Sequence, residues 1–286
     1  MVERLKSAID KARAQRTGFP PAATPAMTAT QATPQASAQA SALKASPVPD
    51  LDLSDWSIFL DAPMDERRLE QERIVARSKK DPAHRAFDML RTRTMRTLQE
   101  KGWSRIGLTS PTKGAGKTVV SLNLAFSLAR QASTRVLLLD LDLVAPRLTQ
   151  IIDPMTDADM GAFLSGRTPP EAYLRRCDDR LLVGLNRAPV PNSAELLQSG
   201  EAVRRIAELI ERTRPTVVIC DLSPIMVSDD ALQVLANVDC ALLVVAAGET
   251  LADEIVESEK LMAEWTPLLG IVLNKCDEKS RDLYGY

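Results

Sequence analysis

Cysteine, histidine and aromatic residues are scarce in this sequence, and long apolar runs are absent. The only histidine among 286 residues is His84, and the four cysteines, none in C-x-x-C spacing, are Cys177, Cys220, Cys240 and Cys276. This pattern argues against a disulfide framework or a zinc site and favours buried free thiols. No stretch reaches the ~18 apolar residues needed to cross a bilayer, and the N-terminus has no signal-peptide core. We therefore expect a cytoplasmic protein.

Neither sign of charge dominates. The chain has 36 basic and 38 acidic side chains, for a formal net charge of −2. Such a balance creates no overall field that would attract nucleic acid or anionic lipid. Basic and aromatic residues are also not interleaved as they are on nucleic-acid-binding surfaces. The sequence therefore predicts no nucleic-acid partner.

Composition divides the chain into a tail and a folded domain. Residues 1–16 carry apolar residues at helical spacing among Lys and Arg, which predicts a short amphipathic helix. Residues 17–80 are expected to form a disordered Ala- and Pro-rich linker, because few large apolar side chains there could offset the entropy of ordering. Within it, residues 51–60 are either a docking segment or an edge piece of the fold. The domain itself is expected over residues 81–286.

Apolar runs alternate with helical patterns throughout this domain. Apolar residues recur at helical spacing before Gly102, which predicts a helix that ends at this glycine. The expected strands are residues 105–109, 135–140, 181–185, 216–221, 239–246 and 269–273. Continuous apolar runs are typical of strands that are covered on both faces. The alternation predicts an α/β fold with a mostly parallel central sheet flanked by helices.

The stretch SPTKGAGKTVV, residues 110–120, follows the first expected strand and opens a helix. This is the context that a P-loop requires. Successive backbone N–H groups would surround phosphate at the helix N-terminus, Lys117 would reach the β and γ phosphates, and Thr118 would bind Mg²⁺. Pro111 replaces the first glycine of the GxxxxGK[ST] pattern, so the bare match is weakened. The acids that follow restore it.

Three acids stand where expected strands end. Asp140 and Asp142 follow the run VLLL, and Asp221 follows VVIC. Ligands of open α/β sheets bind at the carboxyl ends of the strands, so we expect these carboxylates to face the P-loop. Mg²⁺ needs one or two carboxylates beside nucleotide phosphates, and an attacking hydroxyl must be oriented in line with the γ phosphate.

At these residues the sequence resembles the bacterial tyrosine kinases of capsule and exopolysaccharide synthesis, over about residues 83–286. Members of that family carry a modified Walker A motif, a Walker A′ motif ending in D-x-D and a Walker B motif ending in D-x-x-P. The corresponding residues here are 110–118, 137–142 and 217–224. The stretches LRT, NLAFSLA, PNSAELLQS and GIVLNKCD also resemble landmarks of the family. The resemblance implies a P-loop NTPase fold of the deviant-Walker (SIMIBI) type.

The resemblance also implies roles for particular residues, with ATP and Mg²⁺ as cofactors. The expected catalytic residues are Lys117, Asp140 and Asp142, one of the acids orienting the tyrosine hydroxyl. The expected metal ligands are Thr118, Asp140 and Asp221. The expected nucleotide contacts are Thr112, Lys113, Gly114, Ala115, Gly116, Lys117, Thr118, Val119 and Asn274. The expected phosphoacceptors are Tyr284 and Tyr286, at the end of the sequence.

The implied partner is a membrane polysaccharide copolymerase, whose cytoplasmic segment would recruit the protein to the inner face of the cell membrane. The implied homo-oligomer would form through the helix that carries Arg85, Asp88 and Arg91, where the family's E-x-x-R-x-x-R pattern has its first two signs reversed. Two further departures concern the site. Val144 stands where the family has Arg, with Arg147 as a nearby substitute, and Ser223 stands at a usual proline position.

Three other functions are considered. Chromosome-partitioning ATPases carry a second signature lysine at the position of Thr112, so the sequence disfavours that mechanism. A GTPase is an alternative because Asn274 to Asp277 match N-K-x-D, a guanine-reading motif. A nucleotide-gated regulator of the copolymerase, without catalysis, is the remaining alternative.

Overall fold

The structure is a computed structural model that describes residues 52–78, 80–153 and 155–276. The helix expected over residues 1–16 lies outside these ranges. So do most of the expected linker and the two C-terminal tyrosines, and those predictions stay predictions. Within the described ranges, no helix is both long and apolar enough to cross a membrane.

A single sheet forms the centre of the domain. Its strands are β1 (Arg105–Thr109), β2 (Val136–Leu141), β3 (Leu174–Asp178), β4 (Leu181–Gly184), β5 (Val217–Leu222), β6 (Cys240–Ala246) and β7 (Leu268–Asn274). They lie in the order β3-β4-β2-β5-β1-β6-β7, and every neighbouring pair is parallel except β3 with β4. The predicted mostly parallel α/β fold is confirmed.

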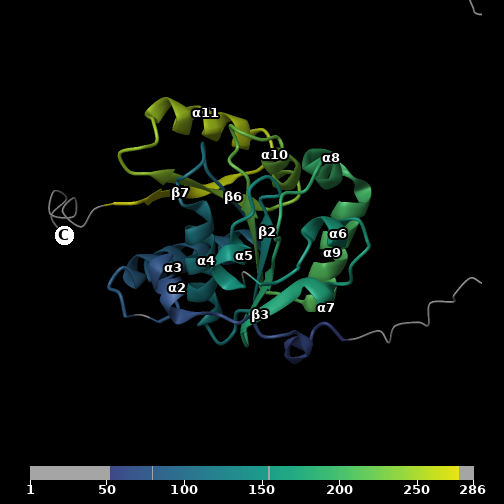
Figure 1. Ribbon diagram of the computed structural model, residues 1–286. Helices are drawn as coiled ribbons and strands as arrows, with labels where there is room; N and C mark the ends of the chain where they lie inside the picture. The colour runs from purple at the N-terminus through teal and green to yellow at the C-terminus, as the bar shows by residue number, and fades with distance from the viewer. Residues whose placement is uncertain (1–51, 79, 154, 277–286) are drawn as a thin grey trace, which may run out of the picture. The chain divides into compact units, whose positions relative to one another are not determined.

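Helices cover both faces of the sheet, so the domain has three layers (Figure 1). They are η1 (Trp56–Ile58), α2 (Glu66–Gln71), α3 (His84–Lys101), α4 (Lys117–Ala129), α5 (Leu148–Ile152), α6 (Met160–Leu164), α7 (Pro170–Tyr173), α8 (Ser193–Gln198), α9 (Gly200–Thr213), α10 (Asp230–Leu235) and α11 (Ala252–Ala263). Helices α3, α4 and α5 lie on one side, and α9, α10 and α11 on the other. The chain crosses the sheet in one direction from β1 to β2 and β4, and in the other direction from β5 to β6 and β7. Right-handed crossovers therefore place the two sets of connecting helices on opposite faces.

All six expected strands are present, within two residues of their predicted ends. The sequence did not reveal β3, whose residues Leu-Arg-Arg-Cys-Asp show no apolar run. An edge strand needs burial on fewer sides than a central one, so its sequence signal is weak. The helix expected to end at Gly102 is α3, and Gly102 adopts φ of 69°, the left-handed conformation that commonly ends helices.

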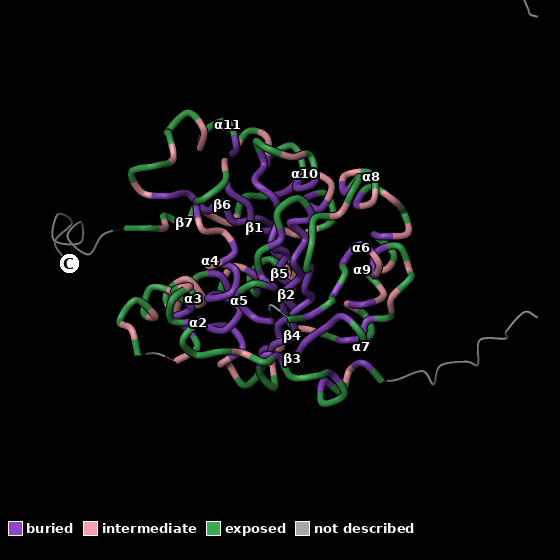
Figure 2. The backbone as a smooth tube through the Cα atoms, viewed as in Figure 1, coloured by how far each residue is buried: buried purple, intermediate pink, exposed green. Residues whose placement is uncertain are grey.

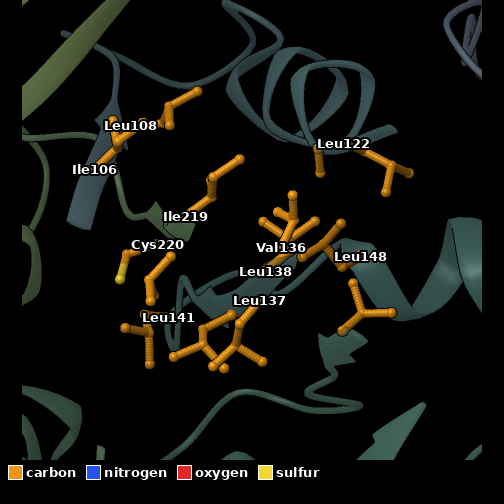
Figure 3. Packing of buried hydrophobic residues seen from close by; sticks show 14 of the residues in the cluster. Ile106, Leu108, Leu122, Val136, Leu137, Leu138, Leu141, Leu148, Ile219 and Cys220 are labelled. Atoms are coloured by element: carbon orange, nitrogen blue, oxygen red, sulfur yellow. The ribbon is translucent and has the colours of Figure 1, made fainter. Parts of the chain in front are cut away.

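The core follows from the apolar strands. Every residue of β2, β5 and β6 is buried, as the continuous apolar runs predicted (Figure 2). Figure 3 shows Leu138 of β2 and Ile219 of β5 packing below Leu122 of α4. The cysteines are free, and Cys177, Cys220 and Cys240 are buried.

Residues 52–78 fold against the domain, so the linker predicted through residue 80 and the boundary at residue 81 need correction. Trp56 is 4% exposed, and its indole Nε1 donates to the carbonyl of Thr213 over 2.9 Å. Arg135 lies over the Trp56 ring, 4.1 Å from its centroid. The sequence misled because charged residues are interspersed among the apolar ones, yet most of these apolar residues are buried in the core: Leu53, Trp56, Phe59, Ala62, Leu69, Ile74 and Ala76. We call residues 52–78 the N-terminal arm.

Two polar contacts fasten the P-loop helix α4 to its surroundings. Asn123 of α4 accepts from the backbone N–H of Ala76 and donates to the carbonyl of Arg73, both at 2.9 Å, which ties the arm to the helix. Asp88 of α3 accepts from Ser127 of α4 at 3.0 Å and forms ion pairs with Arg130 and Arg91. Asp88 and Arg91, expected to serve an oligomer contact, therefore hold α3 on α4.

We predict that Trp56→Ala lowers the free energy of unfolding by ~3–5 kcal/mol, the usual cost of removing a buried tryptophan. Ile58→Ala is the matched control, because Ile58 belongs to the same short helix and is 36% exposed. Chemical denaturation monitored by circular dichroism measures both. Equal, small effects of the two substitutions would show that the arm is not part of the folded domain.

Candidate nucleotide-binding site

The P-loop connects β1 to α4 at the carboxyl end of the sheet. Gly114 and Gly116 adopt φ of 90° and 85°, a backbone region that other residues rarely occupy. A Cβ on Gly116 would also stand 2.3 Å from Nδ2 of Asn274, at the end of β7. Asn274 Nδ2 donates to the carbonyl of Ala115 over 2.9 Å. The loop and β7, separated by some 160 residues, are thereby packed together without room for a larger residue.

Lys117, the first residue of α4, points into the site and pairs with Asp142. Its Nζ lies 2.5 Å from Asp142 Oδ2, and both side chains are largely buried. Burial lowers the pKa of the Lys117 ammonium, but the carboxylates of Asp221 and Asp142 outweigh it, so the pKa lies above its ordinary value. Lys117 therefore remains charged at neutral pH.

Asp221, near the end of β5, is bound by two hydroxyls of α4. Thr118 donates to Oδ2 over 2.7 Å, and Ser121 donates to Oδ1 over 2.9 Å. Sequence reasoning did not identify Ser121. Ser121 could have been found from its spacing, because it stands one helical turn after Lys117 and so lies on the same face of α4.

Asp140 lies beside Asp221, because β2 and β5 pair these two residues in register. Its Oδ2 accepts from the backbone N–H of Leu148 over 3.2 Å, while among the described residues Oδ1 has no hydrogen-bond partner. Burial, then the neighbouring charge of Asp221, raises the pKa of Asp140 well above its ordinary value. A positive charge nearby, such as a metal cation, would instead lower the pKa of Asp140.

The donor set fits a magnesium ion that is shared with a nucleotide. The described part of the chain has no group of three or more His, Cys, Asp or Glu side chains that could hold a metal by themselves. Mg²⁺ typically takes one or two carboxylates and completes its octahedron with waters and phosphates. A Thr118 hydroxyl, the Asp221 carboxylate and the unpartnered Asp140 oxygen meet that requirement.

A cleft of about 390 Å³ opens over the loop. Its walls include Ser110, Lys113, Gly114, Gly116, Lys117, Thr118, Val119, Asp142, Val144, Arg147, Ser223 and Lys275. Val144, which stands where the resembled family has arginine, lines the cleft without supplying a guanidinium. Arg147 lines the same cleft and forms a 3.0 Å ion pair with Glu72 of the N-terminal arm. The structure thus brings a guanidinium to the cleft from three residues further along.

A larger cavity, of about 680 Å³, lies between α6, the loop 186–192 and α8. It contains no P-loop residue and none of the three acids. We assign the nucleotide to the smaller cleft because its cations and backbone N–H groups are what a triphosphate requires.

The expected site residues that line this cleft are Lys113, Gly114, Gly116, Lys117, Thr118, Val119 and Asp142. Asp140 and Asp221 are buried behind the cleft wall, and Asn274 also does not line it. Thr112 and Ala115 lie in the loop but not on the wall: the Thr112 carbonyl accepts from the Ser110 hydroxyl, and Ala115 is buried. Asp277 of the N-K-x-D match and the tyrosines Tyr284 and Tyr286 lie outside the described residues.

Comparison with known proteins agrees with this geometry. Residues 106–284 match the model of the CobQ/CobB/MinD/ParA nucleotide binding domain. The chain belongs to that family. The tyrosine-protein kinase CpsD of Streptococcus pneumoniae serotype 4 is 32% identical over 60% of this chain and 76% of CpsD. The match to this family confirms that the P-loop belongs to a nucleotide-binding domain.

Two further proteins show how far the similarity extends. EpsB of Ralstonia solanacearum is 29% identical over 82% of this chain, but the chain spans 31% of EpsB. The kinase domain of the Escherichia coli tyrosine kinase ETK superposes with a TM-score of 0.63 at 24% identity, covering 79% of this chain and 95% of that domain. At this identity the superposition shows a shared fold.

We predict that Asp140→Asn raises the melting temperature of the nucleotide-free protein at pH 7 by ~2–4 °C, the shift that ~1 kcal/mol produces in a domain of this size. A carboxyl whose pKa is raised by folding favours the folded state below its ordinary pKa of 3.8, and this contribution is lost as the pH rises through the raised value. The gain should therefore shrink as the pH is lowered toward 4.

Asp142→Asn is the matched control. It removes the carboxylate that pairs with buried Lys117, so we expect the melting temperature to fall, since breaking one partner of a buried pair is costly. Thermal melts from pH 4.5 to 8 compare the two variants. A lower melting temperature for Asp140→Asn at pH 7 would contradict the destabilising role of its buried charge.

Proposed function

We propose that this protein is an ATP-dependent protein-tyrosine kinase that phosphorylates its own C-terminal tyrosines and regulates capsule or exopolysaccharide synthesis and export. The observation that carries the proposal is that Lys117, Asp142 and Thr118 line one cleft, with the Thr118 hydroxyl bonded to Asp221 behind it. The kinase names of the relatives support the reaction type. The P-loop and an acid able to meet a hydroxyl are both required for phosphoryl transfer.

In this proposal the chain's own residues position the reactants. The loop N–H groups and the Lys117 ammonium hold the triphosphate. Asp142 lines the cleft, whereas Asp140 does not, which supports Asp142 as the acid that orients the tyrosine hydroxyl and accepts its proton. The phenolic oxygen forms a bond to the γ phosphorus as the bond from that phosphorus to the bridging oxygen of ADP breaks. Mg²⁺, held by Thr118, Asp221 and Asp140, would neutralise phosphate charge.

The proposal includes a membrane polysaccharide copolymerase as partner and a cytoplasmic protein recruited by it to the inner face of the membrane. It also includes self-association through α3. Arg85 is exposed on that helix, while Asp88 and Arg91 are engaged within the chain. A contact through α3 would therefore use Arg85 and its exposed neighbours rather than all three charges.

We predict that the purified protein with ATP and Mg²⁺ gains phosphate on Tyr284 and Tyr286, detected by mass spectrometry. Lys117→Met should abolish the signal, because it removes the ammonium at the γ phosphate. Lys260→Met, an exposed lysine on α11, is the control and should retain it. The assay is run with and without the copolymerase's cytoplasmic segment. Absence of phosphotyrosine in both conditions, despite ATP binding, would identify a nucleotide-gated regulator instead.

We predict that the protein binds ATP more tightly than GTP, and that Lys117→Met weakens ATP binding by ~10–100-fold, the effect of a lost hydrogen bond to a charged group. The resemblance assigns Asn274 to the base, and its side chain is packed on the loop carbonyl of Ala115. Titration calorimetry with both nucleotides measures the preference. Tight binding of GTP without ATP would instead support the N-K-x-D reading and a GTPase.

A further inference from the structure

Ser223 brings an unpartnered hydroxyl to the nucleotide cleft. Its side chain is 0% exposed and lines the cleft together with Lys117 and Asp142. Its carbonyl accepts from the Thr109 hydroxyl over 2.7 Å, which fixes the backbone between the ends of β1 and β5. Its Oγ, in contrast, has no hydrogen-bond partner among the residues that the structure describes. Buried hydroxyls in folded proteins normally have one.

Strand register explains why Ser223 lies at the cleft. β2 and β5 pair Asp140 with Asp221 and Leu141 with Leu222, and Asp142 and Ser223 directly follow these two strand ends. Parallel strands present their carboxyl ends at the same edge of a sheet. Both residues accordingly line the cleft, together with Lys117 of α4 and Gly114 of the loop.

The neighbouring groups leave the Ser223 hydroxyl free for a ligand. Asp142 Oδ2 is engaged by Lys117, and its Oδ1 accepts from the backbone N–H of Ala145 over 3.0 Å. The hydroxyls of Thr118 and Ser121 are committed to Asp221. Lys117 marks the position of the terminal phosphate in a P-loop and lines the same cleft as Ser223, so we expect that phosphate to come within reach of the Ser223 hydroxyl.

We propose that the Ser223 hydroxyl donates a hydrogen bond to the terminal phosphate of a bound nucleoside triphosphate, and so discriminates triphosphate from diphosphate. This inference rests on the proposed nucleotide-binding function and adds to it a residue that the resembled kinases lack, since a proline at this position has no hydroxyl. The β phosphate is held by the loop amides, so Ser223 contributes to ATP affinity and not to ADP affinity. Ser223 is a positioning residue for the transferred phosphoryl group.

Titration calorimetry of the full chain with Mg²⁺ tests the inference, using ADP and a non-hydrolysable ATP analogue. Ser223→Ala should weaken binding of the analogue about tenfold, equivalent to ~1.4 kcal/mol, and leave ADP binding within about twofold. Its melting temperature without nucleotide should not fall, because alanine loses no hydrogen bond present in the structure. A merely structural serine would change the affinities of both nucleotides together.

Ser258→Ala is the matched control. Ser258 is also fully buried, and its hydroxyl also lacks a partner among the described residues, but it belongs to α11 and does not line the cleft. It should change neither affinity. Equal losses for the analogue and ADP in Ser223→Ala, or no loss for either, would overturn the inference while leaving nucleotide binding established. Failure of the wild-type protein to bind both nucleotides would overturn the nucleotide-binding function itself.

Discussion

The ion pair between Lys117 and Asp142 is the contact on which the candidate site depends. Parallel pairing of β2 with β5 brings Asp140, Asp142 and Asp221 to one buried edge of the sheet. Buried carboxylates that lie close together repel one another, and burial disfavours their charged form. The Lys117 ammonium, with the hydroxyls of Thr118 and Ser121 on Asp221, supplies the compensation. All three groups come from a single face of α4.

Compensation is incomplete at Asp140. It has one backbone donor, and its second oxygen has no partner within the described chain, so the pKa of this carboxyl rises while Asp142 stays paired. The buried charge of Asp140 therefore lowers the stability of the folded protein when no ligand is bound. Functional sites commonly retain such groups, because a cation or a phosphate can use what the empty fold leaves unsatisfied.

The position of α4 is determined by elements outside the P-loop motif. Asn123 is bonded to the N-terminal arm, Asp88 joins α3 to α4 through Ser127, and Arg130 donates to the carbonyl of Ala76 over 2.7 Å. The arm also reaches the cleft through the Glu72–Arg147 ion pair. Segments before residue 81 therefore help to set the geometry of the helix that carries Lys117, Thr118 and Ser121.

Much of the fold and the acidic strand ends could be predicted from the sequence, because strands covered on both faces require continuous apolar runs and a P-loop requires its particular residues in order. Asp140, Asp142, Asp221 and Lys117 were identified in this way. The sequence could not show β3, whose pairing depends on its neighbour, or the burial of Trp56, which depends on the apolar surface it meets.

The sequence also could not show which polar side chains bond to one another, because this depends on how distant segments pack. Asp88 bonds with Ser127 and Arg130 rather than projecting to another molecule. Arg147 brings a guanidinium to the cleft, and Ser223 lines that cleft with an unpartnered hydroxyl. Local patterns specify which residues form a strand or a loop. Only the packing of distant segments decides which side chains meet.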